Sequence, residues 1–278
     1  MTTFQIIIVT HNSEHVLSRC LEHLLAQSVD SYRITILDSG SRDPSYLDNY
    51  ANWEKITFIH QTDNVGFSVG NNIAACKVID QAHYFIFLNP DIFLPPDFLL
   101  KVSTIMDSQE QTHTGILGAK LLRYNLDSHW PTDEIDSTGI FQKWYGKWYD
   151  RGQGQRDRGQ FDTPDEGEPV PAVCGALMIC RREALEVAAL SKGEYFRNDF
   201  FMYKEDIELS LRVAESGYKV VYNSYLIAWH TRGWQSRKSA SRVAKLCSAR
   251  NELQINRRLG LIKHLYSRCK LILARSGI

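Results

Sequence analysis

Residues 4–14, Phe-Gln-Ile-Ile-Ile-Val-Thr-His-Asn-Ser-Glu, contain the pattern that decides the fold. Five of the six residues from Phe4 to Val9 are apolar, and most of them are β-branched. Such a run is typical of a strand that is buried on both faces, as in a parallel sheet. Polar residues follow at once, and Asn12 or Ser13 can cap a helix. The stretch therefore predicts a buried strand that leads through a polar turn into a helix.

The same alternation of strand and helix continues beyond this stretch. Further strand-like runs lie at residues 34–37, 56–59 and 84–88, and helical or glycine-rich segments separate them. Strands that alternate with helices predict an α/β fold of the Rossmann-like type with a mostly parallel sheet. In such sheets the ligand binds at the carboxyl ends of the strands. Those ends carry Thr10, His11, Asn12, Asp38, Asn64, Gly66, Asn89 and Asp91.

The composition is that of an ordinary globular protein. The 278 residues are 44% hydrophobic and 23% charged, and their formal net charge is zero, so we expect no nucleic-acid partner. No run approaches the roughly 20 apolar residues of a membrane span, and no signal peptide is predicted. The six cysteines include no C-x-x-C pair, which favours reduced thiols in a cytoplasmic protein.

The carboxyl-terminal segment differs in charge from the rest of the chain. Residues 244–278 contain eight Lys or Arg and one acid, Glu252, which gives a net charge of +7. We therefore expect a main domain at residues 1–243 and a basic helical extension at residues 244–278. The extension has two interpretations: a solvated helix face, or a patch that contacts the anionic inner face of the plasma membrane.

Two loops at the predicted sheet edge have structural and functional interpretations. The loop from Gly66 to Gly70 is neither a Walker A loop nor a G-x-G-x-x-G turn. Its glycines can serve a positive φ, or its amides can meet a phosphate or sugar oxygen. Asn89-Pro90-Asp91 is an ordinary turn, or Asp91 is a carboxylate that holds Mg²⁺ or Mn²⁺.

Two later segments also have alternative interpretations. Residues 123–171 interleave aromatic residues with Asp, Gly, Pro and Arg, as in a long surface excursion or an aromatic wall beside a sugar acceptor. Residues 200–212, Phe-Phe-Met-Tyr-Lys-Glu-Asp-Ile-Glu-Leu-Ser-Leu-Arg, run from bulky residues into an acidic helix start. Asp206 has two interpretations there: a carboxylate that the helix dipole stabilises, or a general base at the rim of a pocket. His230 is a structural histidine or a metal ligand.

In their order, these motifs resemble those of the inverting family-two glycosyltransferases with the GT-A fold, and within them the bacterial rhamnosyltransferase-type group. The motifs are IIIVTHNSE, LDSGSRD, NVGFSVGNN, FLNPD, CGALMICRREAL, FFMYKEDIELSLR and the segment around His230, over about residues 4 to 240. The resemblance implies a dTDP- or UDP-linked sugar donor, a divalent metal (Mg²⁺ or Mn²⁺) and transfer in a single displacement.

The resemblance also implies roles for individual residues. On the donor side it implies Thr10, His11, Asp38, Asn64, Gly66, Phe67, Asn71 and Asn89. It implies Asp91 and His230 as metal ligands, Asp206 as the catalytic base, and Gly175, Glu205 and Trp234 on the acceptor side. The chain departs from the family pattern at His11, at Asn89 and at residues 197–199, where Arg-Asn-Asp replaces a pattern that is usually more acidic. His11 stands where an aromatic residue, usually Tyr, is common, and Asn89 replaces a carboxylate, which lowers the negative charge of the metal site.

The expected function is transfer of a hexose or deoxyhexose, such as rhamnose from dTDP-rhamnose, to a hydroxyl of a bacterial cell-surface glycan or its lipid-linked precursor. A sugar nucleotidyltransferase on a related fold is an alternative, but it needs a basic Gly-rich loop after the first strand, and residues 10–14 contain no Lys, Arg or Gly. A non-catalytic nucleotide- or glycan-binding module is another alternative, against which the presence of Asp91, Asp206 and His230 argues.

Overall fold

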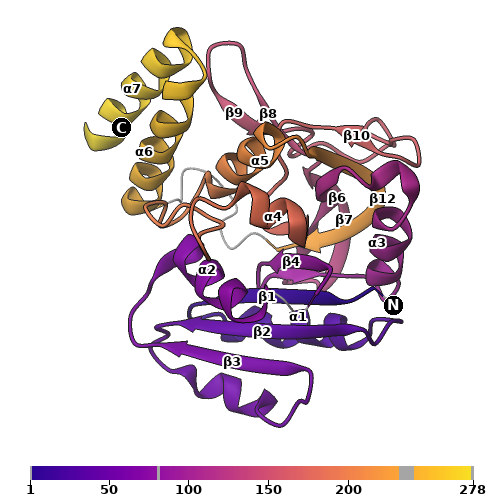
Figure 1. Ribbon diagram of the computed structural model, residues 1–278. Helices are drawn as coiled ribbons and strands as arrows, with labels where there is room; N and C mark the ends of the chain where they lie inside the picture. The colour runs from indigo at the N-terminus through magenta and orange to yellow at the C-terminus, as the bar shows by residue number, and fades with distance from the viewer. Residues whose placement is uncertain (1, 80–81, 232–240, 277–278) are drawn as a thin grey trace.

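The computed structural model describes residues 2–79, 82–231 and 241–276. The amino-terminal part forms parallel strands in the spatial order β4-β1-β2-β3 (Figure 1). Its elements are β1 (Phe4–Thr10), α1 (Glu14–Leu25), β2 (Tyr32–Ser39), the 3-10 helix η1 (Pro44–Tyr50), β3 (Ile56–Gln61), α2 (Gly66–Val78) and β4 (Tyr84–Leu88). In this register Thr10 pairs with Asp38, and Asp38 pairs with His60. The carboxyl ends of these strands therefore meet at one edge of the sheet.

Most of the remaining strands extend the same sheet, and two helices end the chain. They are β5 (Ile92–Phe93), α3 (Phe98–Met106), η3 (Gln109–Gln111), β6 (Thr114–Asn125), β7 (Trp130–Ser137), β8 (Ile140–Gln142), β9 (Trp148–Asp150), β10 (Glu168–Pro169), β11 (Leu177–Arg181), α4 (Arg182–Ala188), α5 (Glu205–Glu215), β12 (Lys219–His230), α6 (Arg242–Arg258) and α7 (Leu261–Ser276). The sheet continues from β4 through β11, β6 and β12 to β10. Its three longest ladders, β6–β12, β1–β2 and β2–β3, are parallel, so the predicted α/β fold with a mostly parallel sheet is confirmed.

Strand β1 is buried on both faces, as its apolar run predicts. Ile6 and Ile8 belong to one hydrophobic core, with residues of α1 and α3. Ile7, between them, belongs to the core on the other face, with residues of α2, α4 and α5. Successive side chains of a strand point to opposite faces, so an unbroken apolar run supplies both layers.

The segment at residues 123–171 contains more regular secondary structure than the surface excursion that its sequence suggests. Strand β6 runs on to Asn125, β7 pairs with it antiparallel, and β8 and β9 form a separate two-stranded hairpin. The aromatic residues of this segment do not form one wall. Trp148 is buried in a small core with Phe200 and Ile207, whereas Trp130 and Trp144 are exposed.

The carboxyl-terminal extension is helical, as predicted, and its first helix packs on the main domain. Ile255 of α6 joins the small core of Trp148, Phe200 and Ile207. Helix α7 packs on α6 at one end of the molecule, and the β8–β9 hairpin reaches beside it (Figure 1). Among the described residues, no helix combines the length and the apolar character that crossing a bilayer requires.

Candidate active site

The polar residues at the ends of β1 and β2 are tied to one another. Thr10 is fully buried, and its hydroxyl lies 2.9 Å from the Tyr46 hydroxyl of η1. The Asp38 carboxylate is also buried and accepts from the backbone N–H of Ser41 at 3.3 Å. The exposed His11 ring places Nδ1 2.9 Å from the carbonyl oxygen of Ser39. Three predicted donor-side residues thus lie at one edge, and η1 completes the group through Tyr46.

The glycine-rich loop makes a close backbone contact with the loop that precedes α5. Gly66 has φ +79°, and a Cβ there would lie 2.5 Å from the carbonyl oxygen of Phe201. The Phe67 N–H donates to that same oxygen at 2.9 Å. The Asn64 side-chain oxygen accepts from the Gly66 N–H and shapes the turn. Glycine is therefore required at this position for its φ and for the close approach, and the contact joins the two halves of the site.

The other predicted donor-side residues have partners within the protein. Asn71 is buried, and its side-chain N–H₂ donates to the Phe67 carbonyl one turn earlier in α2. The Phe67 ring packs edge-on against Phe196, with 5.5 Å between the centroids. The backbone N–H of Asn89 donates to Ala176, next to Gly175. This last bond brings the segment that leads to Asp91 beside the segment that holds Asp206.

Asp91 and His230 form the predicted pair, and a third residue completes it. His230 Nε2 lies 3.3 Å from an Asp91 carboxylate oxygen, and its Nδ1 lies 2.8 Å from Asp136. All three side chains are largely or fully buried. Burial alone lowers the pKa of His230, but the charge of Asp91 and the hydrogen bond to Asp136 outweigh it and raise the pKa to about 9.

This donor set fits a hard divalent cation that takes most of its ligands from elsewhere. In the described part of the chain, no group of three or more His, Cys, Asp or Glu is arranged to hold a metal. Mg²⁺ typically takes one or two carboxylates and completes its shell with phosphate oxygens and water. A carboxylate on the far nitrogen of a ligating histidine, as Asp136 provides for His230, fixes the tautomer and the ring orientation.

Asp206 lies in the first turn of α5, and backbone groups hold its carboxylate. One oxygen accepts from the Gly175 N–H at 2.9 Å and the other from its neighbour Ile207 at 2.8 Å. A Cβ on Gly175 would lie 3.0 Å from the Asp206 Cβ, so the glycine makes room for this side chain. Burial raises the pKa of Asp206, and the charge of Lys204 and the two N–H bonds act against that rise.

Glu205 is the more deeply buried acid of the pair. It is 7% exposed, and one carboxylate oxygen has no hydrogen-bond partner among the described residues. Burial, and then the neighbouring charge of Asp206, raise the pKa of Glu205 to about 8. The two acids of this first turn are thus placed differently: both oxygens of Asp206 accept from backbone N–H groups, whereas one oxygen of Glu205 has no hydrogen-bond partner among the described residues.

Comparison with known proteins identifies the family. Residues 5–188 match the family model described as glycosyl transferase family 2. The chain belongs to glycosyltransferase family 2. No curated protein sequence matches it.

Solved structures of glycosyltransferases share the fold of this family-2 chain at low sequence identity. GalNAc-T7, in a structure with UDP, GalNAc and Mn²⁺, is 15% identical over 92% of this chain and 48% of its own, with a TM-score of 0.69. The mannosyltransferase PcManGT from Pyrobaculum calidifontis, with GDP-Man and Mn²⁺, is 14% identical over 99% of this chain and 73% of its own, with a TM-score of 0.60. S. aureus TarS, residues 1–349, is 16% identical over 97% of this chain and 69% of its own, with a TM-score of 0.55. The chain spans about half the length of GalNAc-T7.

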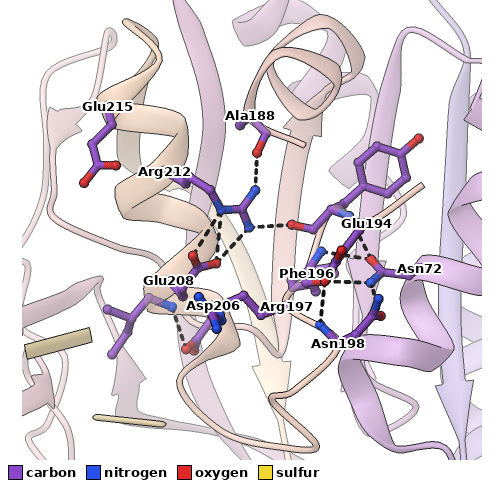
Figure 2. Close-up of polar contacts among 12 residues, drawn as sticks. Asn72, Ala188, Glu194, Phe196, Arg197, Asn198, Asp206, Glu208, Arg212 and Glu215 are labelled. Atoms are coloured by element: carbon purple, nitrogen blue, oxygen red, sulfur yellow. Dashed lines mark hydrogen bonds and ion pairs between the residues drawn. The ribbon is translucent and has the colours of Figure 1, made fainter. Parts of the chain in front are cut away.

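A buried polar frame supports the Asp206 side of the candidate site (Figure 2). Arg212 of α5 pairs with Glu208 at 2.8 Å and donates to the carbonyl oxygens of Ala188 and Tyr195. Asn72 of α2 accepts from the N–H groups of Tyr195 and Phe196, and it donates to the Phe196 carbonyl and to Asn198. These bonds fix residues 188–198 against α2 and α5. The frame therefore positions the loop at residues 199–204 that leads to Asp206.

Helix α6 holds the same loop from the other side. Tyr203 and Lys204 both have positive φ, +68° and +73°, which L-residues adopt only when their surroundings hold them. Asn251 of α6 donates to the carbonyl oxygens of Met202 and Tyr203 at 3.1 and 2.8 Å. The extension thus contributes a positioning residue to the candidate site.

Several of these positioning residues carry no local signal in the sequence. Asp136, Tyr46, Asn72, Arg212 and Asn251 lie in segments whose patterns predict a turn, a surface excursion or a helix face. One predicted acceptor-side residue, Trp234, lies outside the described residues. A cavity of about 150 Å³ between α5 and α6 is separate from the candidate site, because its lining includes neither Asp91 nor Asp206.

Proposed function

We propose that this chain is an inverting, metal-dependent hexosyltransferase. In this proposal it moves a hexose or deoxyhexose, with rhamnose from dTDP-rhamnose as the first candidate, from a nucleotide-sugar donor. The acceptor is a hydroxyl of a bacterial cell-surface glycan or of its lipid-linked precursor, at the inner face of the plasma membrane. In this role the protein would take part in the biosynthesis of a cell-envelope polysaccharide.

The observation that carries the proposal is the setting of Asp206. An acceptor hydroxyl has a high pKa and needs a base as it attacks the anomeric carbon. The Asp206 carboxylate is oriented by the N–H groups of Gly175 and Ile207, and burial raises its pKa, which makes it a stronger base. The loop that leads to Asp206 contacts the proposed donor loop, because Phe201 meets Gly66 and Phe67. A single base on the acceptor side is what one inverting displacement requires.

The opposite side of the site supplies the groups for the leaving diphosphate. Asp91 and the Nε2 of His230 would hold Mg²⁺ or Mn²⁺, and Asp136 keeps the His230 ring in place through Nδ1. When bound, the cation would offset the charge that develops on the departing diphosphate. Thr10, His11 and Asp38 would face the nucleotide, and Asn64, Gly66, Phe67, Asn71 and Asn89 would line the sugar and the diphosphate.

The similar structures support a nucleotide-sugar donor and leave its base open. Their descriptions name UDP with GalNAc, GDP-Man and UDP-GlcNAc, and two of them name Mn²⁺. His11 stands at the position proposed to face the base, and an imidazole ring can stack on it. A thermal-shift panel of dTDP-, UDP- and GDP-sugars with Mn²⁺ or Mg²⁺ identifies the donor, because a ligand that binds only the folded state raises its melting temperature.

The test of mechanism is the Asp206→Asn variant. Loss of the base should lower transfer by about 100-fold or more, while the donor-induced shift in melting temperature persists. The matched control is Asp199→Asn, the same change in the preceding loop at a residue paired with Arg197. Full transfer activity in Asp206→Asn would contradict the proposal. If NMR of the product shows a retained anomeric configuration, the inverting mechanism is contradicted, but the proposed transferase activity is not.

A further inference from the structure

Helix α7 has one face that packs on α6 through polar contacts. Ser267 and Ala274 are buried on this face. Asn256 of α6 donates to the Ser267 hydroxyl at 2.7 Å, and Lys270 pairs with Glu252 at 2.6 Å. Amphipathic helices normally turn their apolar stripe toward the protein core. In α7 the inward face is the one that carries the polar contacts.

The exposed large apolar residues of α7 lie on the opposite face, whereas the half-buried Leu271 lies nearer the inward one. At 100° per residue they fall within an arc of about 120°, centred away from Ser267 and Ala274. Each of them is between 48% and 73% exposed. We call this set the outer face of α7: Leu261, Ile262, Leu265, Ile272 and Leu273.

An exposed tryptophan lies beside the outer face. Trp144, near the tip of the β8–β9 hairpin, is 77% exposed. Its ring packs edge-on against Tyr145, and Tyr145 packs against Tyr266 of α7, with 5.6 and 5.1 Å between the centroids. The hairpin and α7 reach the same end of the molecule in Figure 1. The apolar surface therefore includes two segments that are more than 100 residues apart in the chain.

The charge around the outer face is positive. Arg268 and Arg275 project at one edge of the apolar arc, and both are exposed. Glu252, the only acid from residue 244 to the end of the chain, is fully buried against Lys270. No exposed acidic side chain at residues 244–276 therefore offsets the basic residues of the extension.

We propose that the outer face of α7, together with Trp144, docks on an anionic lipid bilayer. Apolar side chains enter the headgroup boundary, tryptophan prefers that depth, and arginine binds anionic headgroups. A second copy of the chain fits this surface less well, because it would bring like charges together. Docking would orient the site, since α6 joins α7 to the Asp206 loop through Asn251. The proposal concerns a surface outside the transfer site and is tested without donor or acceptor.

The experiment is co-sedimentation of the full chain with phosphatidylcholine vesicles that contain or lack phosphatidylglycerol. We expect the wild type to bind the anionic vesicles only. Leu265→Gln/Ile272→Gln should weaken this binding by at least about tenfold, and Arg268→Gln/Arg275→Gln by about 10- to 30-fold. The control is Leu100→Gln/Val187→Gln, which changes two similarly exposed apolar residues elsewhere and should bind as the wild type does.

A second readout reports the contact itself. Brominated lipids should quench tryptophan fluorescence in the wild type and quench it much less in Trp144→Phe, because Trp144 enters the interface. Equal vesicle binding by the wild type and the α7 variants would overturn the proposal, as would no binding at low salt. A concentration-dependent dimer that Leu265→Gln/Ile272→Gln abolishes would assign the surface to self-association instead. The α7 variants should transfer sugar to a water-soluble acceptor as the wild type does. This measurement distinguishes loss of membrane binding from failure of the proposed transfer activity.

Discussion

The two halves of the molecule place their site residues by different means. In the amino-terminal half, Thr10 and Asp38 lie at the ends of β1 and β2, and Asp91 follows β4, so the apolar runs of these strands fix both position and direction. In the carboxyl-terminal half, Asp206 and His230 depend on buried side chains that arrive from distant segments. Parallel strands suffice to bring the first group together, whereas the second needs a polar frame. The difference indicates that the carboxyl-terminal half supplies the part of the candidate site most sensitive to single substitutions.

The largest expected effect comes from removing the centre of that frame. Arg212→Met would leave Glu208 buried without its partner and the carbonyl oxygens of Ala188 and Tyr195 without a donor. Breaking such a buried pair costs about 3–5 kcal/mol in the free energy of unfolding. The measurement is denaturant unfolding.

The matched control for this change is Arg258→Met. Arg258 pairs with Glu215 at the same distance, 2.9 Å against 2.8 Å, but its side chain is 57% exposed. Exposed pairs contribute about 1 kcal/mol or less. If the two variants lose equal stability, burial of the frame is not what distinguishes the carboxyl-terminal half.

The next effect concerns the pH dependence of stability. Between the usual pKa of Glu205, 4.5, and its raised value of about 8, the folded protein holds a proton that the unfolded chain has released. Stability therefore falls as pH rises through this window. Relative to Glu205→Gln, the wild type should lose about 3 kcal/mol in the free energy of unfolding between about pH 5 and pH 8.

The control for this prediction is Glu186→Gln, at an exposed position of α4. Its difference from the wild type should stay constant over the same pH range. Denaturant titrations at several pH values measure both differences. A flat difference for Glu205→Gln would show that the carboxyl group of Glu205 is ionised in the folded protein at neutral pH.

The sequence predicts the amino-terminal half well because its signals are local. The strand at Phe4–Thr10 and the polar residues after it need only the period of the apolar pattern. Two neighbours show the limit of such signals. Asn71 bonds within its own helix, whereas Asn72 bonds to residues 195–198. Nothing in the local pattern distinguishes these two asparagines, since the partners of Asn72 lie more than 120 residues away.

Strand β6 explains what the sequence leaves out of the site. Lys120 interrupts its apolar pattern, and this lysine is buried only because Asp157 and Asp162 pair with it. Strands β7 and β12 both pair with β6, and this arrangement brings Asp136 to His230. Asp136 and His230 meet because β6 lies between their strands, and Lys120 interrupts the apolar pattern that would identify β6. No local sequence pattern therefore predicts that these two side chains pair. The resemblance therefore predicts Asp91 and His230 as metal ligands, and it does not predict Asp136.

The smallest expected effect tests this orienting residue. Asp136→Asn keeps the size of the side chain but removes the charge that faces Nδ1 of His230. Loss of such a partner typically lowers metal affinity by about 10- to 100-fold. We expect that loss for Mn²⁺ in the presence of a nucleoside diphosphate, measured by calorimetry or by the electron paramagnetic resonance of free Mn²⁺. Asp133→Asn, in the same strand at an exposed ion pair with Arg156, should bind Mn²⁺ as the wild type does. Unchanged affinity in Asp136→Asn would mean that neighbouring side chains alone hold the His230 ring.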